Sequence, residues 1–298
     1  MTAADRARYD DAALRASSTI IDAYSTSFGR AARMLAEPVR TQVRSIYGLV
    51  RLADEIVDGA FDGTTVEDRR ALLEDLEAET ARAVERGYST NLTVHAFALT
   101  ARAAGIDAEL TGPFFESMRT DLARTEHDAS SLDAYVHGSA EVVGLMCLRV
   151  FLLDTPGTAT DRQRRYEHLA PGAVALGAAF QKVNFLRDLA ADRDELGRNY
   201  LQVAPTRLTD TERDHILDDI DRDLATARAT IGELPRSSRR GVHAAHALFA
   251  ALSHQLRRTP AATIAARRVR VPTRTKIAVL ARVALADARP GRTREVTS

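Results

Sequence analysis

The sequence contains only one cysteine, Cys147, so the chain cannot form an internal disulfide. A metal site built from several cysteines is excluded for the same reason. The thiol lies in the apolar run 142–153, which predicts a buried structural position. Net charge is also absent, because 41 basic residues balance 41 acidic residues. The overall charge therefore indicates neither a nucleic acid nor a strongly acidic protein as a partner.

Long apolar runs are missing as well. Arg149 interrupts the longest one, well short of the ~20 residues that a membrane-spanning helix requires. No basic segment followed by an apolar segment opens the chain, so a secretion signal is not expected. We therefore expect a cytoplasmic protein.

The charge balance is lost only in the C-terminal region. From Arg257 onward, eleven Lys or Arg residues accompany two acidic residues, Asp287 and Glu295. Such a region is either a solvated helix face with a basic tail, or a surface that meets phosphates or a membrane. Peripheral membrane contact therefore stays open, and the sequence indicates no particular oligomeric state.

The sequence does contain the pattern of a helical protein. Its 298 residues are 45% hydrophobic and 28% charged, and apolar residues recur at three- and four-residue spacings. Glycine and proline, including those in 105–113 and 171–172, divide the chain into about ten predicted helices. No internal repeat or low-complexity linker is present. We predict an all-α fold with a single domain over residues 1–298, whose core runs from about residue 20 to about residue 285.

Two of the predicted helices end in acidic residues. One covers Val39 to Asp58 and the other covers Ala173 to Asp192, and each runs into a segment that contains glycine. If the two helices pack side by side, their carboxylates lie at a shared mouth.

Each of these helices carries a polar stripe, because residues three and four apart share a helix face. The first stripe consists of Tyr47, Arg51, Asp54 and Asp58, and the second of Gln181, Asn184, Asp188 and Asp192. Unpaired polar groups are costly to bury, so such stripes do not suit an apolar core.

The two polar stripes are consistent with a metal-binding site. Two aspartates one turn apart can bind Mg²⁺, which is commonly held by one or two carboxylates together with substrate phosphates. Arg51 or Arg187 can donate to the phosphate oxygens, and the cations neutralise a departing diphosphate. The alternative is that both acidic clusters are solvated surface charge, paired with Arg51, Arg187 and Arg193.

Several segments resemble the squalene and phytoene synthase family, and the likeness covers the chain from Tyr24 to Leu280. The segments that carry it are 24–28, 46–51 with 54–58, 118–122, 135–146, and 181–192 with 197–201. The amino-acid sequences of segments 181–189 and 142–146 are most similar to those of bacterial phytoene synthases. Such enzymes have an isoprenoid-synthase-type helical bundle around a central cavity, and this chain is expected to share it.

The resemblance also implies roles for individual residues. Mg²⁺, or Mn²⁺ in its place, would be bound by Asp54, Asp58, Asp188 and Asp192. The diphosphates would be contacted by Tyr24, Ser25, Thr26, Ser27, Tyr47, Arg51, Gln181, Asn184 and Arg187. Phe249 aligns with a tyrosine of many members and would keep the ring without the hydroxyl. Tyr135 or the released diphosphate would take the final proton. Arg270 and Lys276 match a basic pattern only loosely and are assigned no role.

The reaction that the resemblance implies is head-to-head condensation of two geranylgeranyl diphosphates, through prephytoene diphosphate, to 15-cis-phytoene in carotenoid biosynthesis. Dehydrosqualene or squalene synthesis from farnesyl diphosphate is the nearest alternative, and no nicotinamide cofactor is expected. A terpene cyclase or a head-to-tail prenyltransferase is disfavoured, because their aspartate motifs differ from both copies here. From another class, a non-catalytic helical assembly factor stays open, although such a protein should have lost carboxylates.

Overall fold

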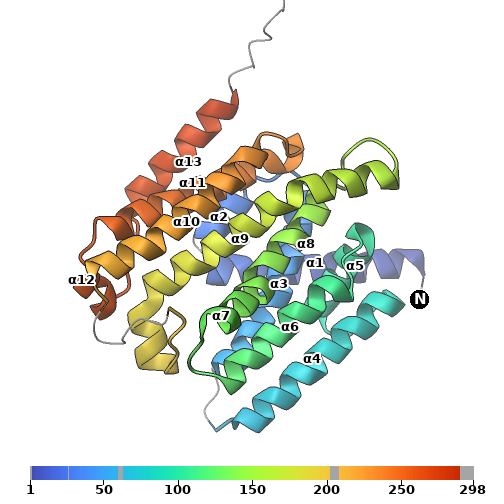
Figure 1. The fold of residues 1–298 in the computed structure, drawn as a ribbon. Coiled ribbons are helices and arrows are strands. Elements are labelled where there is room, and N and C mark those ends of the chain that lie inside the picture. Colours follow the sequence, from blue (N-terminus) through green and yellow to red (C-terminus); the bar gives the residue numbers. More distant parts are fainter. Residues whose placement is uncertain (1, 26, 60–62, 202–207, 289–298) are drawn as a thin grey trace, which may run out of the picture.

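A computed structural model describes residues 2–25, 27–59, 63–201 and 208–288 of the chain. Over these residues it contains thirteen α-helices, one short π-helix (η1) and no strand, which confirms the all-α prediction (Figure 1). The number of helices exceeds the predicted ten. Their bounds are α1 (Ala3–Tyr24), α2 (Ser27–Ala32), α3 (Val39–Asp58), α4 (Val66–Arg86), α5 (Leu92–Ala104), α6 (Ala108–Ala123), α7 (Ala129–Val136), η1 (His137–Glu141), α8 (Val142–Phe151), α9 (Ala159–Leu196), α10 (Asp210–Ile231), α11 (Arg236–Arg257), α12 (Ala261–Ala266) and α13 (Thr273–Ala288).

The first acidic helix has the predicted bounds, whereas the second is much longer than predicted. Helix α9 spans 38 residues and runs straight through Pro171 and Gly172, so the break predicted there was wrong. A proline inside a helix costs about 3 kcal/mol through its missing N–H and its steric clash. Packing along both sides of α9 offsets this cost, since Leu169 and Ala175 on either side of the proline are buried. Pro113 is likewise inside α6 rather than at a break.

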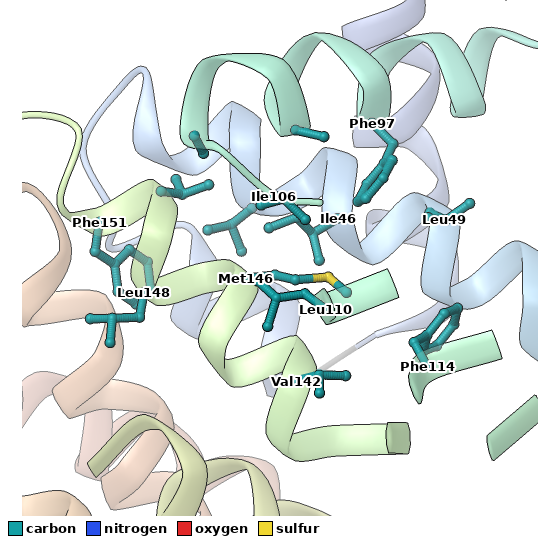
Figure 2. Close-up of a cluster of buried hydrophobic side chains, with 14 of the residues drawn as sticks. Ile46, Leu49, Phe97, Ile106, Leu110, Phe114, Val142, Met146, Leu148 and Phe151 are labelled. Carbon is teal, nitrogen blue, oxygen red and sulfur yellow. The ribbon is translucent and has the colours of Figure 1, made fainter. Parts of the chain in front are cut away.

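The two largest apolar clusters of the described residues hold most of the bundle together. In the larger one, Ile46 and Leu49 of α3 face Phe97 of α5, Phe114 of α6 and Met146 of α8 (Figure 2). The second joins α9, α10, α11 and α12, with fully buried members such as Val183, Leu217 and Leu256. Burying a large aliphatic or aromatic side chain contributes roughly 1.5–3 kcal/mol, so these clusters fix the positions of α3 and α9.

Helix α9 is in near backbone contact with η1 and α8. A Cβ added to Gly144 would lie 2.6 Å from the carbonyl oxygen of Ala173, and one added to Gly177 would lie 2.5 Å from that of Ala140. Only glycine permits this approach, so the two glycines set the width of the space between the helices.

That space is an apolar cavity of about 200 Å³ enclosed by α2, α3, η1, α8, α9, α10 and α11. Small residues make up much of its wall, among them Ala31, Ala32, Ala140, Gly144, Gly172, Ala173, Gly177, Ala227, Gly241 and Ala245. The central cavity of the predicted fold is therefore present. Among the helices that the structure describes, none combines the length and the apolar character needed to cross a membrane.

Candidate active site

The two acidic motifs occupy the C-terminal ends of α3 and α9. Both helices stop at a glycine with left-handed backbone, Gly59 (φ 69°) after Asp58 and Gly197 (φ 67°) after α9. This conformation favours glycine and is a common helix terminator. Arg198, just after the end of α9, donates to Asp58 Oδ1 at the end of α3 (3.0 Å), so the two motifs lie close together. We call this acidic cluster, Asp54, Asp58, Asp188 and Asp192, the mouth.

Two carboxylates of the mouth are difficult to ionise. Burial, followed by repulsion from Asp58, raises the pKa of Asp54 to about 7. Burial, followed by repulsion from Asp188, raises the pKa of Asp192 to about 7. Crowded acids of this kind gain stability from a nearby cation, because an opposite charge favours the ionised form.

The described residues contain no group of three His, Cys, Asp or Glu placed to hold one metal ion unaided. The mouth nevertheless suits Mg²⁺, which keeps several waters and binds one or two carboxylates with substrate phosphates completing its shell. Its donors are all carboxylate oxygens, the ligand type that Mg²⁺ prefers. The metal assignment of the four aspartates stays a prediction.

Arg198 holds the two halves of the mouth together, a role that its position in the sequence did not indicate. It is 7% exposed and follows α9, yet its guanidinium donates to Asp58 Oδ1 (3.0 Å) and to the carbonyl oxygen of Val57 (3.0 Å) on α3. Its Nε also lies 3.9 Å from Asp121 Oδ1. Arg198 is part of the segment 197–201 that resembles the family, but its partners are distant in sequence.

Asp121 of α6 is a buried carboxylate behind the mouth. It accepts hydrogen bonds from the hydroxyls of Tyr135 (2.7 Å) and Tyr200 (2.8 Å). Burial raises its pKa, and the adjacent Arg198 guanidinium opposes that rise. Burial also raises the pKa of Tyr135 well above its ordinary value, so in this structure Tyr135 is a hydrogen-bond donor. To act as the predicted final base, Tyr135 would first have to lose its hydroxyl proton, either to Asp121 or to the diphosphate.

Arg51 and Tyr24 pack against each other at the edge of the mouth. The Arg51 guanidinium lies 4.4 Å from the centre of the Tyr24 ring and donates through Nε to Glu55 Oε1 (3.0 Å). Tyr47 stacks on Phe28, a cavity-lining residue, with ring centres 5.8 Å apart. The first polar stripe thus leads from the mouth to the cavity.

The other predicted substrate contacts have different surroundings. Ser25 accepts a hydrogen bond from the backbone N–H of Gly29 (3.3 Å). Thr26 lies outside the described residues, and of Ser27 only the backbone, at the start of α2, is described.

On α9, Gln181 is partly buried, and the side-chain oxygen of Asn184 is buried without a hydrogen-bond partner among the described residues. Phe249 stacks on Phe180 with ring centres 3.7 Å apart, and it is Phe180 that lines the cavity. Phe249 therefore supports the wall from behind.

A cationic cluster, Arg30, Arg187, Arg268, Arg270 and Lys276, lies beside Asp188. Nε atoms of both Arg187 and Arg268 lie 2.8 Å from Asp188 Oδ1. Burial and then repulsion from neighbouring cations lower the pKa values of Arg268 and Lys276. Repelling cations of this kind favour a multiply charged anion. The sequence indicated Arg187 and a basic region after Arg257, but it did not predict the cluster, because only the fold brings the start of α13 to the end of α9.

The acids of the mouth predict an unusual dependence of stability on pH when divalent cations are absent. Asp54 and Asp192 bind protons more tightly in the folded state, so their contribution to stability is lost as the pH rises from near 3.8 to about 7. His127 and His246, whose pKa values are lowered by burial, act in the opposite direction. We therefore expect the stability difference between the Asp54→Asn/Asp192→Asn variant and the natural protein to grow across this range. Urea unfolding at a series of pH values in EDTA measures it, and a constant difference would contradict the assignment.

Comparison with known proteins gives one family. A family model described as squalene/phytoene synthase matches residues 21–275. Phytoene synthase 1 of Zea mays is 29% identical over 201 residues, which is 65% of this chain and 46% of that protein. The 15-cis-phytoene synthase of a Paracoccus species is 26% identical over 252 residues, covering 78% and 79% of the two chains. A bifunctional lycopene cyclase/phytoene synthase of Blakeslea trispora is 25% identical over 91% of this chain and 49% of its own length. The chain thus spans about half the length of the maize and Blakeslea proteins.

Solved structures share the fold. A dehydrosqualene synthase crystallised with a ligand superposes with a TM-score of 0.77 at 18% identity, covering 94% of this chain and 98% of that one. A squalene synthase from Alicyclobacillus acidocaldarius gives a TM-score of 0.66 at 18% identity over 83% and 94% of the two chains. The architecture is therefore the all-α isoprenoid synthase fold.

Proposed function

Because the chain belongs to the squalene/phytoene synthase family, a family of prenyltransferases, we propose that it joins two geranylgeranyl diphosphates head to head to make phytoene. The observation that carries the proposal is the mouth itself. Acidic ends of two helices and a cationic cluster meet there, and Tyr47 of the same polar stripe stacks on Phe28, which lines the apolar cavity. Such a site can hold a diphosphate at one end and its hydrocarbon chain at the other.

In this proposal, the four aspartates of the mouth would hold Mg²⁺, and the cationic cluster with Arg51 would bind the diphosphate oxygens. Bound Mg²⁺ would supply charge stabilisation for the departing diphosphate. Breaking the C1–O bond of the first substrate sends the electron pair to the diphosphate and leaves an allylic cation. The C2–C3 double bond of the second substrate attacks that cation, and loss of a proton closes a cyclopropane ring, giving prephytoene diphosphate. A second ionisation and rearrangement join the chains C1 to C1, and a final proton loss gives the product.

The cavity wall protects these cations from water. Its lining is almost entirely apolar. Cys147, predicted to be fully buried, is partly buried and lines the cavity, and desolvation raises the pKa of its thiol to about 12, so it stays protonated. A carbocation in contact with water would be captured as an alcohol, so exclusion of water is a requirement of the chemistry.

Support for the twenty-carbon substrate comes from the relatives named phytoene synthase and from the small residues along the cavity. The alternative is farnesyl diphosphate, which would give dehydrosqualene or, with a reduced nicotinamide, squalene. This alternative is retained because the chain superposes on the structure of a dehydrosqualene synthase.

One experiment separates the candidates. The purified protein is incubated with Mg²⁺ and either farnesyl or geranylgeranyl diphosphate, with and without reduced nicotinamide, and the hydrocarbon is identified. We expect phytoene from the twenty-carbon substrate, without a need for nicotinamide. The absence of a condensation product from both substrates would instead support the non-catalytic assembly factor.

Narrowing the cavity should shift the choice between substrates. Ala227 of α10 lines the cavity and is 1% exposed. It lies one helical turn before Thr230, whose side chain packs against Gly172 of α9. Ala227→Leu fills part of the space that the longer chain needs, and a misplaced methylene group is worth about 10- to 200-fold in discrimination. We expect kcat/KM for geranylgeranyl diphosphate to fall at least about tenfold relative to that for farnesyl diphosphate. An equal loss with both substrates would indicate general damage to the fold rather than selection by length.

A further inference from the structure

Helix α13 has an exposed apolar stripe on its outer face. Ile277 is 58% exposed and Leu285 is 70% exposed, and both rank among the large hydrophobic residues that the described part of the chain leaves in solvent. Ala278 and Ala281 are also exposed and lie between them at helical spacing. The four side chains follow one side of the helix for about two turns. We call this set, Ile277, Ala278, Ala281 and Leu285, the outer stripe.

Positive charge flanks the outer stripe. Arg274 precedes it and Arg282 lies beside it, and both are exposed. The two arginines Arg267 and Arg270, just before α13, are exposed as well. The sequence has no acidic residue between Arg257 and Ala286, so no carboxylate within this segment offsets the charge. An apolar stripe with basic flanks matches an anionic lipid surface, where the stripe enters the interface and the arginines meet the headgroups.

The inner face of α13 covers the wall of the cavity. Val279, Leu280 and Val283 belong to one apolar cluster with Ala31, Ala245 and Phe180, which line the cavity. Figure 1 shows α13 at the periphery of the bundle, alongside α11. Near the start of α13, Lys276 belongs to the cationic cluster at the mouth. The helix thus has the cavity on one side and solvent on the other.

We infer that the outer stripe docks this protein on the surface of an anionic bilayer, with α13 lying parallel to the membrane plane. Docking here would place both the mouth and the cavity wall close to the lipid phase. In that position an amphipathic diphosphate can enter from the bilayer and an oily product can return to it. The docking itself depends only on the outer stripe and its arginines, so it can be tested independently of the proposed reaction.

The test is flotation of the purified full chain with lipid vesicles. One set contains phosphatidylcholine alone, and in the other about a third of the lipid is phosphatidylglycerol, which gives a negative surface potential. We expect the protein to float with the anionic vesicles, with at least about tenfold weaker binding to neutral vesicles and a clear loss at high salt. The double variant Ile277→Ser/Leu285→Ser should lower binding at least about tenfold, and Arg274→Glu/Arg282→Glu should remove the preference for anionic lipid.

Matched controls come from α4. Leu72 is 49% exposed and Arg82 is exposed there, so Leu72→Ser and Arg82→Glu change the same residue types on another surface and should leave flotation unchanged. None of these residues belongs to the mouth or the cavity, so activity on detergent-dispersed substrate should be retained in all variants. Equal binding by the stripe variants and the natural protein would overturn the inference. Loss of self-association in the stripe variants, measured by sedimentation without lipid, would instead assign the stripe to a protein interface.

Discussion

Replacing Asp192 with asparagine is expected to lower turnover at least about 100-fold while stabilising the metal-free protein. Burial, followed by repulsion from Asp188 and Asp58, raises the pKa of Asp192 to about 7, so its ionised form is destabilised in the folded protein. Asparagine keeps the shape and removes the charge, so the repulsion falls. In the proposed mechanism the same substitution would also remove a ligand for Mg²⁺, which would neutralise the leaving diphosphate, so activity is expected to fall. The combination of lost turnover and gained stability is characteristic of a site that is completed by a ligand.

The matched control is Asp194→Asn, two residues further along α9. Asp194 is 61% exposed in its side chain and pairs with Arg193, and hydrogen bonds from that arginine lower its pKa. Turnover should be retained, and stability should be unchanged or slightly lower. Steady-state turnover and urea unfolding in EDTA measure the two effects. Addition of Mg²⁺ should then raise the unfolding midpoint of the natural protein more than that of Asp192→Asn. Retained turnover in Asp192→Asn would remove this residue from the metal site.

The local features of the site follow from the sequence. The bounds of α3 were predicted correctly because its apolar spacing is regular and Pro38 and Gly59 lie just outside its ends. The acidic residues fall at the ends of α3 and α9 for the same reason. The helix break predicted at Pro171 was wrong, because a proline considered without its tertiary contacts indicates the end of a helix. Whether the helix continues depends on what packs against it, and that information is in α8 and α10.

The contacts that join the motifs could not be predicted from spacing. Arg198 reaches Asp58 across 140 residues of sequence, and Tyr200 reaches Asp121 across 79. The cationic cluster likewise forms only when Arg268 arrives beside Asp188. Periodicity describes one helix at a time, whereas these pairs depend on how helices from distant parts of the chain are brought together. The sequence therefore predicts which groups the site contains more readily than how they are held.

Among these long-range contacts, we expect those of Arg198 to contribute most to the free energy of unfolding. Arg198→Met leaves the buried Asp121 with two tyrosine hydroxyls as its hydrogen-bond partners and removes the hydrogen bonds to Asp58 and to the Val57 carbonyl. Removing one partner of a buried ion pair costs about 3–5 kcal/mol, because the remaining charge is left uncompensated. We expect the free energy of unfolding, measured in urea at fixed pH, to fall by about that amount.

Two further variants test the physical reason. Adding Asp121→Asn to Arg198→Met should recover part of the lost stability, because the uncompensated charge is then gone. Arg222→Met should cost less than about 1 kcal/mol, since Arg222 is 74% exposed and pairs only locally with Asp219. A loss for Arg198→Met as small as that for Arg222→Met would mean that solvent already compensates Asp121. A large loss that Asp121→Asn partly reverses would mean that one guanidinium both neutralises the back of the mouth and fixes the end of α3 against the segment after α9.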